Sequence, residues 1–153
     1  MSENANPFAP RPGQVDYTHA RFAPVINCIL RHKGKILLVK RSSTLNFYPG
    51  LWNGISGFLD DDKTLEEKVK EELKEEAGIE AGSIRAITLG TIFHQEEPEY
   101  KKTWIVHAVL VDVATDAVKL DWEAMEYYWI DPEETDTLDL LPGFEKVLAE
   151  FFS

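Results

Sequence analysis

The sequence predicts one α/β domain, on three observations. Two aliphatic runs flank a short polar turn at residues 31–34, a pattern typical of a β-hairpin. A helical pattern with an apolar stripe covers residues 64–78, and further strand-like runs lead to a last helix near the C-terminus. The length of 153 residues suits one domain with a sizeable core, and 44% hydrophobic with 28% charged residues is typical of a soluble globular protein.

The charge balance excludes several functional classes. Sixteen Lys and Arg against 27 Asp and Glu give a formal net charge of −11, which argues against non-specific binding to nucleic acid or to anionic membranes. An acidic protein still binds polyphosphates when metal ions bridge the two. The single cysteine, Cys28, excludes an internal disulfide, and no apolar run approaches the ~18 residues of a membrane span. Because the N-terminus has no signal-peptide pattern, we expect a cytoplasmic protein.

Residues 1–22 are expected to form an irregular arm before the domain, which we place at residues 23–153. Three prolines, at positions 7, 10 and 12, exclude a regular helix in that part of the arm. The sequence leaves two alternatives open: a loose tail, or an arm that packs through Phe8 and Tyr17 on the domain or on a second subunit. A homodimer is therefore compatible with the sequence, which does not decide the oligomeric state.

The first regular element is the hairpin, with strands expected over residues 25–30 and 36–41. β-branched and aliphatic residues fill both runs. The loop at residues 42–53 contains the turn sequence Tyr-Pro-Gly, and a short strand over residues 54–57 then leads toward the helix.

The helix has recognisable signals at both ends. Thr64 is a plausible N-cap, with Glu67 three residues on as its capping-box partner. Gly78 suits the left-handed position that ends a helix. Between these signals the apolar residues recur every four positions and form one stripe: Leu65, Val69, Leu73 and Ala77.

The acidic residues of this helix are not distributed as on an ordinary solvated surface. Glu72 and Glu76 project beside the apolar stripe, and Glu75 lies just outside them. Like charges four residues apart destabilise a helix by roughly a few tenths of a kcal/mol per pair. The alternative is a charged surface helix, which would place these acids opposite the stripe. Their convergence favours a hard divalent cation held by oxygen ligands.

Beyond the helix, the pattern predicts three more strands and a last helix. Strands are expected over residues 84–93, 104–113 and 122–130, and a polar loop with three acids over residues 94–102. The last helix follows the Pro-Gly pair at residues 142–143. Its apolar face contains four residues: Phe144, Val147, Leu148 and Phe151.

The stretch from residue 57 to residue 79 resembles the Nudix box. That pattern is a glycine, five residues, a glutamate, seven residues, arginine-glutamate, an aliphatic, any residue, two glutamates, any residue, glycine and an aliphatic. The matching positions are Gly57, Glu72, Leu73, Glu75, Glu76, Gly78 and Ile79. Two positions depart, because Lys63 stands where the first glutamate belongs and Glu71 stands where the arginine belongs.

This resemblance, which extends more loosely over residues 24–152, implies a fold and an activity. The fold would be an α/β/α sandwich, with a mixed β-sheet between helices. The activity would be the hydrolysis of a diphosphate bond in a nucleoside diphosphate linked to another moiety, with Mg²⁺ as the cation and Mn²⁺ as the alternative.

The resemblance also assigns roles to particular residues. The implied metal ligands are the carboxylates of three glutamates and a backbone carbonyl at Gly57 or its neighbour: Glu72, Glu75, Glu76 and Gly57. Glu72 and Glu75 would also act in catalysis. A further carboxylate is expected from the loop after the box, where Glu96, Glu97 and Glu99 are the candidates and we select Glu96; Glu126 is a weaker candidate. Arg41, at the end of a strand before the box, would contact a phosphate.

Two functions of other classes stay open. The departures at Lys63 and Glu71 are compatible with a catalytically weak Nudix-like module that binds a nucleotide. An allylic diphosphate isomerase is the second, although it would want a reactive cysteine near the site, and Cys28 lies within a strand-like run. The two departures also suggest one joint event, in which the family's ion pair is present with its charges reversed.

Overall fold

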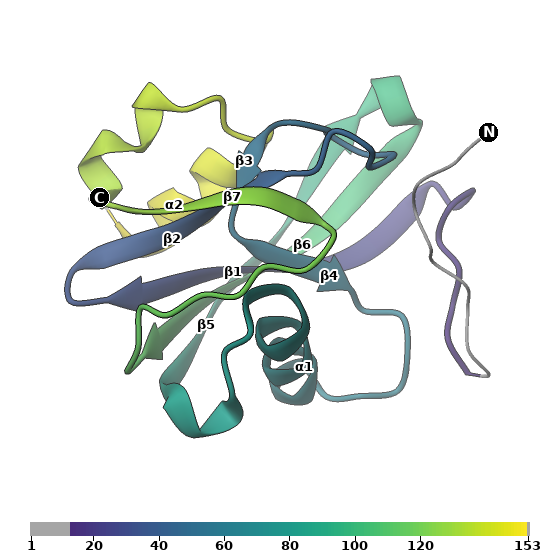
Figure 1. Cartoon of the computed structure of the whole chain (residues 1–153). Helices are drawn as coiled ribbons and strands as arrows, with labels where there is room; N and C mark the ends of the chain where they lie inside the picture. The colour runs from purple at the N-terminus through teal and green to yellow at the C-terminus, as the bar shows by residue number, and fades with distance from the viewer. Residues whose placement is uncertain (1–12, 153) are drawn as a thin grey trace.

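A seven-stranded mixed β-sheet separates two α-helices in the computed structural model, which describes residues 13–152 (Figure 1). The strands are β1 Phe22–His32, β2 Lys35–Arg41, β3 Trp52–Asn53, β4 Ile55–Phe58, β5 Ile84–Glu97, β6 Lys102–Val113 and β7 Ala124–Ile130. The helices are α1 Leu65–Ala77 and α2 Phe144–Phe151, with short 3₁₀ turns at Ala81–Ser83, Pro98–Tyr100 and Pro132–Thr137. The expected α/β/α sandwich is therefore confirmed.

The sheet is ordered β3-β2-β1-β6-β5, with β4 paired to β1 and β7 paired to β2. The expected hairpin is formed by β1 and β2, and its turn residues Lys33 and Gly34 both have positive φ angles. β1 runs parallel to β6 and antiparallel to β4. Because β4 pairs with the first half of β1, its Gly57 lies opposite Ile26 in the middle of the sheet, directly before the chain leaves for α1.

Alternating side chains of β1 divide the core into two layers. Ile29 packs with α2, whereas Cys28 and Leu30 belong to the cluster that contains the stripe of α1. This period of two is the expected behaviour of a strand buried on both faces. The two helices therefore cover opposite faces of the sheet.

α1 forms as its sequence predicts. Thr64 accepts a hydrogen bond from the Glu67 amide, the Glu67 side chain accepts one from the Thr64 amide, and Gly78 ends the helix in the left-handed region with φ 67°. Both ends of the helix are thus capped, which fixes the rotation of its acidic face relative to the sheet.

The polar loop expected at residues 94–102 is much shorter in the structure. β5 continues to Glu97, and the pairs Glu96↔Thr103 and Glu97↔Lys102 extend its ladder with β6. The acids of this segment are tolerated within a strand because β5 is the edge of the sheet and its side chains there remain solvated. The expectation of a loop over the whole of residues 94–102 was therefore wrong, because a polar sequence is also compatible with an edge strand.

Residues 13–21 of the arm contain neither helix nor strand and run beside the loop that precedes α1 (Figure 1). Phe8, one of the two arm residues expected to pack, lies outside the described residues. Within residues 13–152, no helix is both long and apolar enough to cross a membrane.

Candidate functional site

One cavity of about 460 Å³ lies between α1, β4, the loop after β2 and the arm. Five glutamates from two separate segments line it: Glu71, Glu72, Glu75, Glu76 and Glu123. Gly57 and Arg41 line the same cavity. The structure thus brings together all of the predicted site residues except Glu96.

Gly57 is required where the sheet meets the acidic face of α1. A Cβ atom at this position would lie 2.5 Å from the carboxyl carbon of Glu72 and 2.7 Å from both of its oxygens. The glycine therefore creates the space that the Glu72 carboxylate occupies. This gives Gly57 a steric role in addition to the carbonyl ligand implied by the sequence.

We expect Gly57→Ala to lower turnover by roughly 10-fold or more with little loss of stability, because the new Cβ would displace only the flexible end of Glu72. Gly54→Ala is the matched contrast: its Cβ would lie 2.5 Å from the Cys28 carbonyl oxygen, which is backbone. It should destabilise the fold instead. Thermal unfolding and steady-state kinetics of both variants check this, and a Gly57→Ala protein of normal activity would contradict the assigned role.

Glu72 and Glu76 form a hydrogen-bonded pair of carboxyl groups on neighbouring turns of α1. Burial, followed by repulsion from Glu123 and Glu72, raises the pKa of Glu76 well above its ordinary value. Burial also raises the pKa of Glu72 to about 7. Both shifts have the same physical cause, because two neighbouring carboxyl groups with little access to water are costly to hold in the charged form together.

Glu123 is a site residue that the sequence analysis missed. It precedes β7, and burial, with repulsion from Asp121 and Glu72, raises its pKa to about 7. β7 pairs with β2 so that Ala124 lies opposite Arg41, and this register carries Glu123 to the cavity. No local pattern marks the residue, because its position depends on a pairing between strands more than eighty residues apart.

The other predicted carboxylates lie elsewhere. Glu96 does not line the cavity; its side chain is 72% exposed and lies 3.5 Å from the Arg21 guanidinium. Its strand pairing with Thr103 holds it at the solvated end of β5. Glu126 is 61% exposed and lies 3.8 Å from Lys40. The geometry therefore favours Glu123, rather than Glu96, as the carboxylate from outside the helix.

Arg41 lines the cavity as expected for a phosphate contact, but it also holds the neighbouring loop. Its Nε and Nη2 atoms donate to the Phe47 carbonyl at 3.1 and 2.9 Å. Burial lowers the pKa of Arg41, and nearby Glu76 and Glu123 oppose that shift. The guanidinium thus stands beside the acidic cluster as a poorly solvated cation.

The donor set suits a hard divalent cation. Glu72, Glu76 and Glu123 are partly or fully buried, and burial raises the pKa of each, whereas Glu75 is exposed. A bound cation would favour the charged form of the three carboxyl groups. Across residues 13–152, no three His, Cys, Asp or Glu side chains are already gathered as a metal site. The fit therefore rests on the chemistry, burial and shared cavity of the glutamates.

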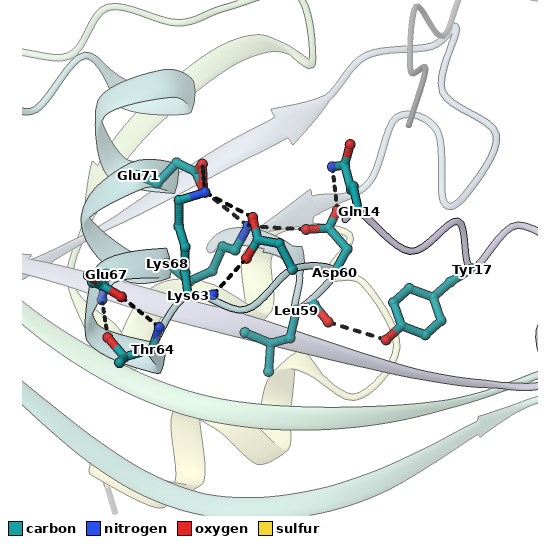
Figure 2. Close-up of polar contacts among 10 residues, drawn as sticks. Gln14, Tyr17, Leu59, Asp60, Lys63, Thr64, Glu67, Lys68 and Glu71 are labelled. Atoms are coloured by element: carbon teal, nitrogen blue, oxygen red, sulfur yellow. Dashed lines mark hydrogen bonds and ion pairs between the residues drawn. The ribbon is translucent and has the colours of Figure 1, made fainter. Parts of the chain in front are cut away.

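The two departures from the box pattern meet in one ion-pair network (Figure 2). Lys63 Nζ lies 3.5 Å from a Glu71 oxygen and 2.9 Å from an Asp61 oxygen. The reversed pair anticipated from the sequence is thus present. Because this pair is partly exposed, we assign it a positioning effect rather than a large contribution to stability.

Lys68 is the buried centre of this network. Its side chain is 3% exposed, and its ammonium lies 3.1 Å from Asp60, 3.1 Å from Asp61 and 3.0 Å from Glu71 (Figure 2). Burial alone would lower the pKa of Lys68, but the hydrogen bonds to these carboxylates outweigh it and raise the pKa. The network ties the loop before α1 to the helix turn that carries Glu72.

A double-mutant cycle tests the reversed pair. Lys63→Glu would place a third acid beside Asp61 and Glu71, and Glu71→Arg would place a cation beside Lys68. We expect each to lower turnover by roughly 3- to 30-fold, and the double variant to recover most of the loss. Simple additivity, or a gain in activity from Glu71→Arg alone, would contradict the reversed pair.

A model of the NUDIX domain matches residues 21–151, and the chain therefore belongs to the Nudix family. A NAD-capped RNA hydrolase NudC from Vibrio atlanticus (strain LGP32) is 31% identical over 130 residues, which cover 84% of this chain and 45% of that protein. The chain thus spans less than half the length of the curated relatives it matches.

Solved structures agree on the fold. A MutT protein from Methanosarcina mazei Go1 is 26% identical, with a TM-score of 0.67 and coverage of 87% of this chain and 94% of that one. The NUDIX domain of Shewanella oneidensis NrtR, solved with ADP ribose, has a TM-score of 0.69 at 18% identity, covering 83% and 84%. Family membership supports a pyrophosphohydrolase, in a family that generally uses divalent metals.

Proposed function

We propose that this protein is a Mg²⁺-dependent pyrophosphohydrolase that cleaves the diphosphate of a nucleoside diphosphate linked to another moiety. The observation that carries this proposal is that the buried Glu76 and its neighbour Glu72 face one cavity together with Glu75 and Glu123. A cluster of this kind is unfavourable by itself and becomes favourable with a bound cation.

The proposed metal ligands are Glu72, Glu75 and Glu76, with a backbone carbonyl at Gly57 or Ser56 beside them. A divalent cation bound there would neutralise the diphosphate and acidify the attacking water. Arg41, the cationic side chain beside the glutamates, would bind a phosphate oxygen. The ion-pair network around Lys68 would hold the helix turn of Glu72 in place.

We assign the role of general base to Glu123 instead of Glu96. Glu123 lies outside α1, and its carboxylate would accept a proton from the attacking water. Glu123→Gln is expected to lower kcat by about 10²-fold or more, a loss typical of a general base, whereas Glu96→Gln should leave kcat unchanged. Parallel kinetics of the two purified variants decide between them. A large effect at Glu96 alone would restore the original prediction and remove Glu123 from the mechanism.

Neither of the other two functions has comparable support. Cys28 is fully buried in the core cluster beneath α1, and burial raises the pKa of its thiol, so it is not placed as a reactive isomerase group. The weak-module alternative relied on the two departures from the box, and the ion pair between Lys63 and Glu71 accounts for both.

A substrate panel with Mg²⁺ tests the proposal. The panel contains ADP-ribose, NAD⁺, a dinucleoside polyphosphate, nucleoside triphosphates, an RNA with a 5′ NAD cap and an allylic diphosphate. We expect cleavage at a diphosphate in at least one small molecule, with the net charge of −11 disfavouring the RNA over free NAD⁺. Binding of these compounds without turnover would favour the weak module, and isomerisation without phosphate release would favour the isomerase.

A further inference from the structure

The arm before the domain forms part of the cavity wall. Five consecutive arm residues line the same cavity as the glutamates: Gln14, Val15, Asp16, Tyr17 and Thr18. The match to the NUDIX domain begins only at residue 21, so this wall is an addition to the part of the chain that resembles the family.

The part of the cavity beside the arm is aromatic. Tyr17 stacks on Phe58 with ring centroids 5.8 Å apart and an interplanar angle of 15°, and Phe58 lies 6.2 Å from Trp104. Phe47 packs edge-on against Trp104 at 5.2 Å. All four rings line the cavity. These aromatic side chains could stack on a planar ring of a substrate. They offer no comparable interaction to a phosphate.

A buried lysine holds the arm in this position. The ammonium of Lys102 donates hydrogen bonds to the carbonyls of Tyr17 at 2.6 Å, of Thr18 at 3.0 Å and of Ala20. Lys102 is only 3% exposed, and burial lowers its pKa. Three acceptors satisfy the three protons of an ammonium, so the turn of the arm takes the place of its hydration shell.

A second attachment joins the arm to the network of Lys68. The Val15 amide donates to the Asp60 carbonyl at 2.6 Å, and the Gln14 amide group donates to an Asp60 carboxylate oxygen at 2.8 Å (Figure 2). The other oxygen of that carboxylate accepts from Lys68 at 3.1 Å. The arm is therefore attached to the loop that joins β4, which contains Gly57, to α1.

The charge of the arm indicates which part of a substrate it would contact. The pKa of Asp16 is lowered by hydrogen bonds from the Thr18 side chain and amide, so Asp16 is an anion at neutral pH. The Lys102 ammonium bound to this segment offsets the charge of Asp16, so residues 14–18 present no net positive charge that would attract a phosphate. The diphosphate would then bind at the glutamate cluster, and the uncharged ring of the substrate would bind at the arm.

We propose that residues 14–18 are a specificity segment that binds a planar heteroaromatic ring of the substrate, and that Lys102 is the positioning residue of this segment. The inference rests on the proposed function, because it concerns the same cavity. It divides the cavity between glutamates that bind the diphosphate and an arm that selects the attached group.

The test compares Lys102→Met and Tyr17→Ala with two matched controls, Lys101→Met and Tyr17→Phe. KM and kcat are measured with NAD⁺ and ADP-ribose, and inorganic pyrophosphate is used as a competitive inhibitor without a ring. We expect Lys102→Met and Tyr17→Ala to raise KM by about 10-fold or more while kcat and the Ki of pyrophosphate change less than about 2-fold. Lys101→Met should retain the wild-type values. Tyr17→Phe keeps the ring but loses the hydrogen bond from its hydroxyl to the Leu59 carbonyl, so its KM should stay well below that of Tyr17→Ala.

Other outcomes overturn the inference. An unchanged KM in both test variants would mean that the arm does not bind the substrate ring. Similar fold-changes in KM, kcat and Ki would mean that the arm has a structural role only. If Lys102→Met does not fold, the pair of Tyr17 variants decides. A wild-type protein that hydrolyses neither nucleotide and does not bind them would remove both proposals, whereas an active enzyme indifferent to the arm variants would remove only this one.

Discussion

Glu76→Gln is expected to lower kcat/KM by about 10³-fold while the folded structure persists. The substitution keeps the size of the side chain, but the resulting amide cannot ionise. It therefore cannot supply a negatively charged ligand to a cation. Because burial raises the pKa of Glu76 and so disfavours its charged form, the fold should tolerate a neutral amide at this position. The loss should therefore fall on catalysis, in the range expected for a group that stabilises developing charge.

Glu66→Gln is the matched control on the same helix. Glu66 is 68% exposed and lies 3.8 Å from Lys70, so removing its charge should leave both activity and unfolding temperature nearly unchanged. Steady-state kinetics and circular dichroism of the two variants make the comparison. A Glu76→Gln enzyme with near-normal turnover would remove Glu76 from the metal site.

Lys68→Met is expected to destabilise the protein by about 3–5 kcal/mol, the usual consequence of removing one partner from a buried ion pair. Three carboxylates would lose the buried cation that they share: Asp60, Asp61 and Glu71. Burial would raise the pKa of Asp61, but hydrogen bonds from Lys63 and Lys68 outweigh it and lower that pKa to about 2. Without Lys68, Lys63 alone remains to compensate this charge.

Lys70→Met, two residues along the same helix, is the comparison for this prediction. The Lys70 side chain is 46% exposed, and its pair with Glu66 at 3.8 Å should be worth about 0–1 kcal/mol. Denaturant unfolding of both variants at pH 7.5 gives the two free energies. Equal losses would mean that the network around Lys68 is no more than a surface feature. We also expect Lys68→Met to lose activity, because the ion-pair network fixes the position of the α1 turn that contains Glu72.

The helix and its acidic face were predictable because their signals are local. The spacing of Leu65, Val69 and Leu73 fixes the buried stripe, and the caps at Thr64 and Gly78 fix the length. Once these are known, the rotation of 100° per residue places Glu76 at the buried edge. The pairing of the charges at positions 63 and 71 was instead anticipated from the resemblance to the Nudix box, because both positions carry the charge opposite to that of the pattern.

The rest of the site depends on contacts between distant segments. Glu123 reaches the cavity only through the pairing of β7 with β2, and the arm reaches it only through Lys102 and Asp60. Glu96 was expected in a loop, because a polar run on an edge strand has the same composition as a loop. Nothing in the local sequence distinguishes these cases.

The claim that the glutamates of α1 form a divalent-cation site is tested most directly by calorimetric titration of Mg²⁺ at pH 7.5 in two buffers that differ in ionisation enthalpy. Because burial raises the pKa of both Glu72 and Glu76, we expect saturable binding that releases a proton, so the apparent enthalpy should differ between the buffers. Glu76→Gln should abolish the binding and Glu66→Gln should retain it. Equal titration curves for the wild type and Glu76→Gln, or no saturable binding in the wild type, would contradict the account.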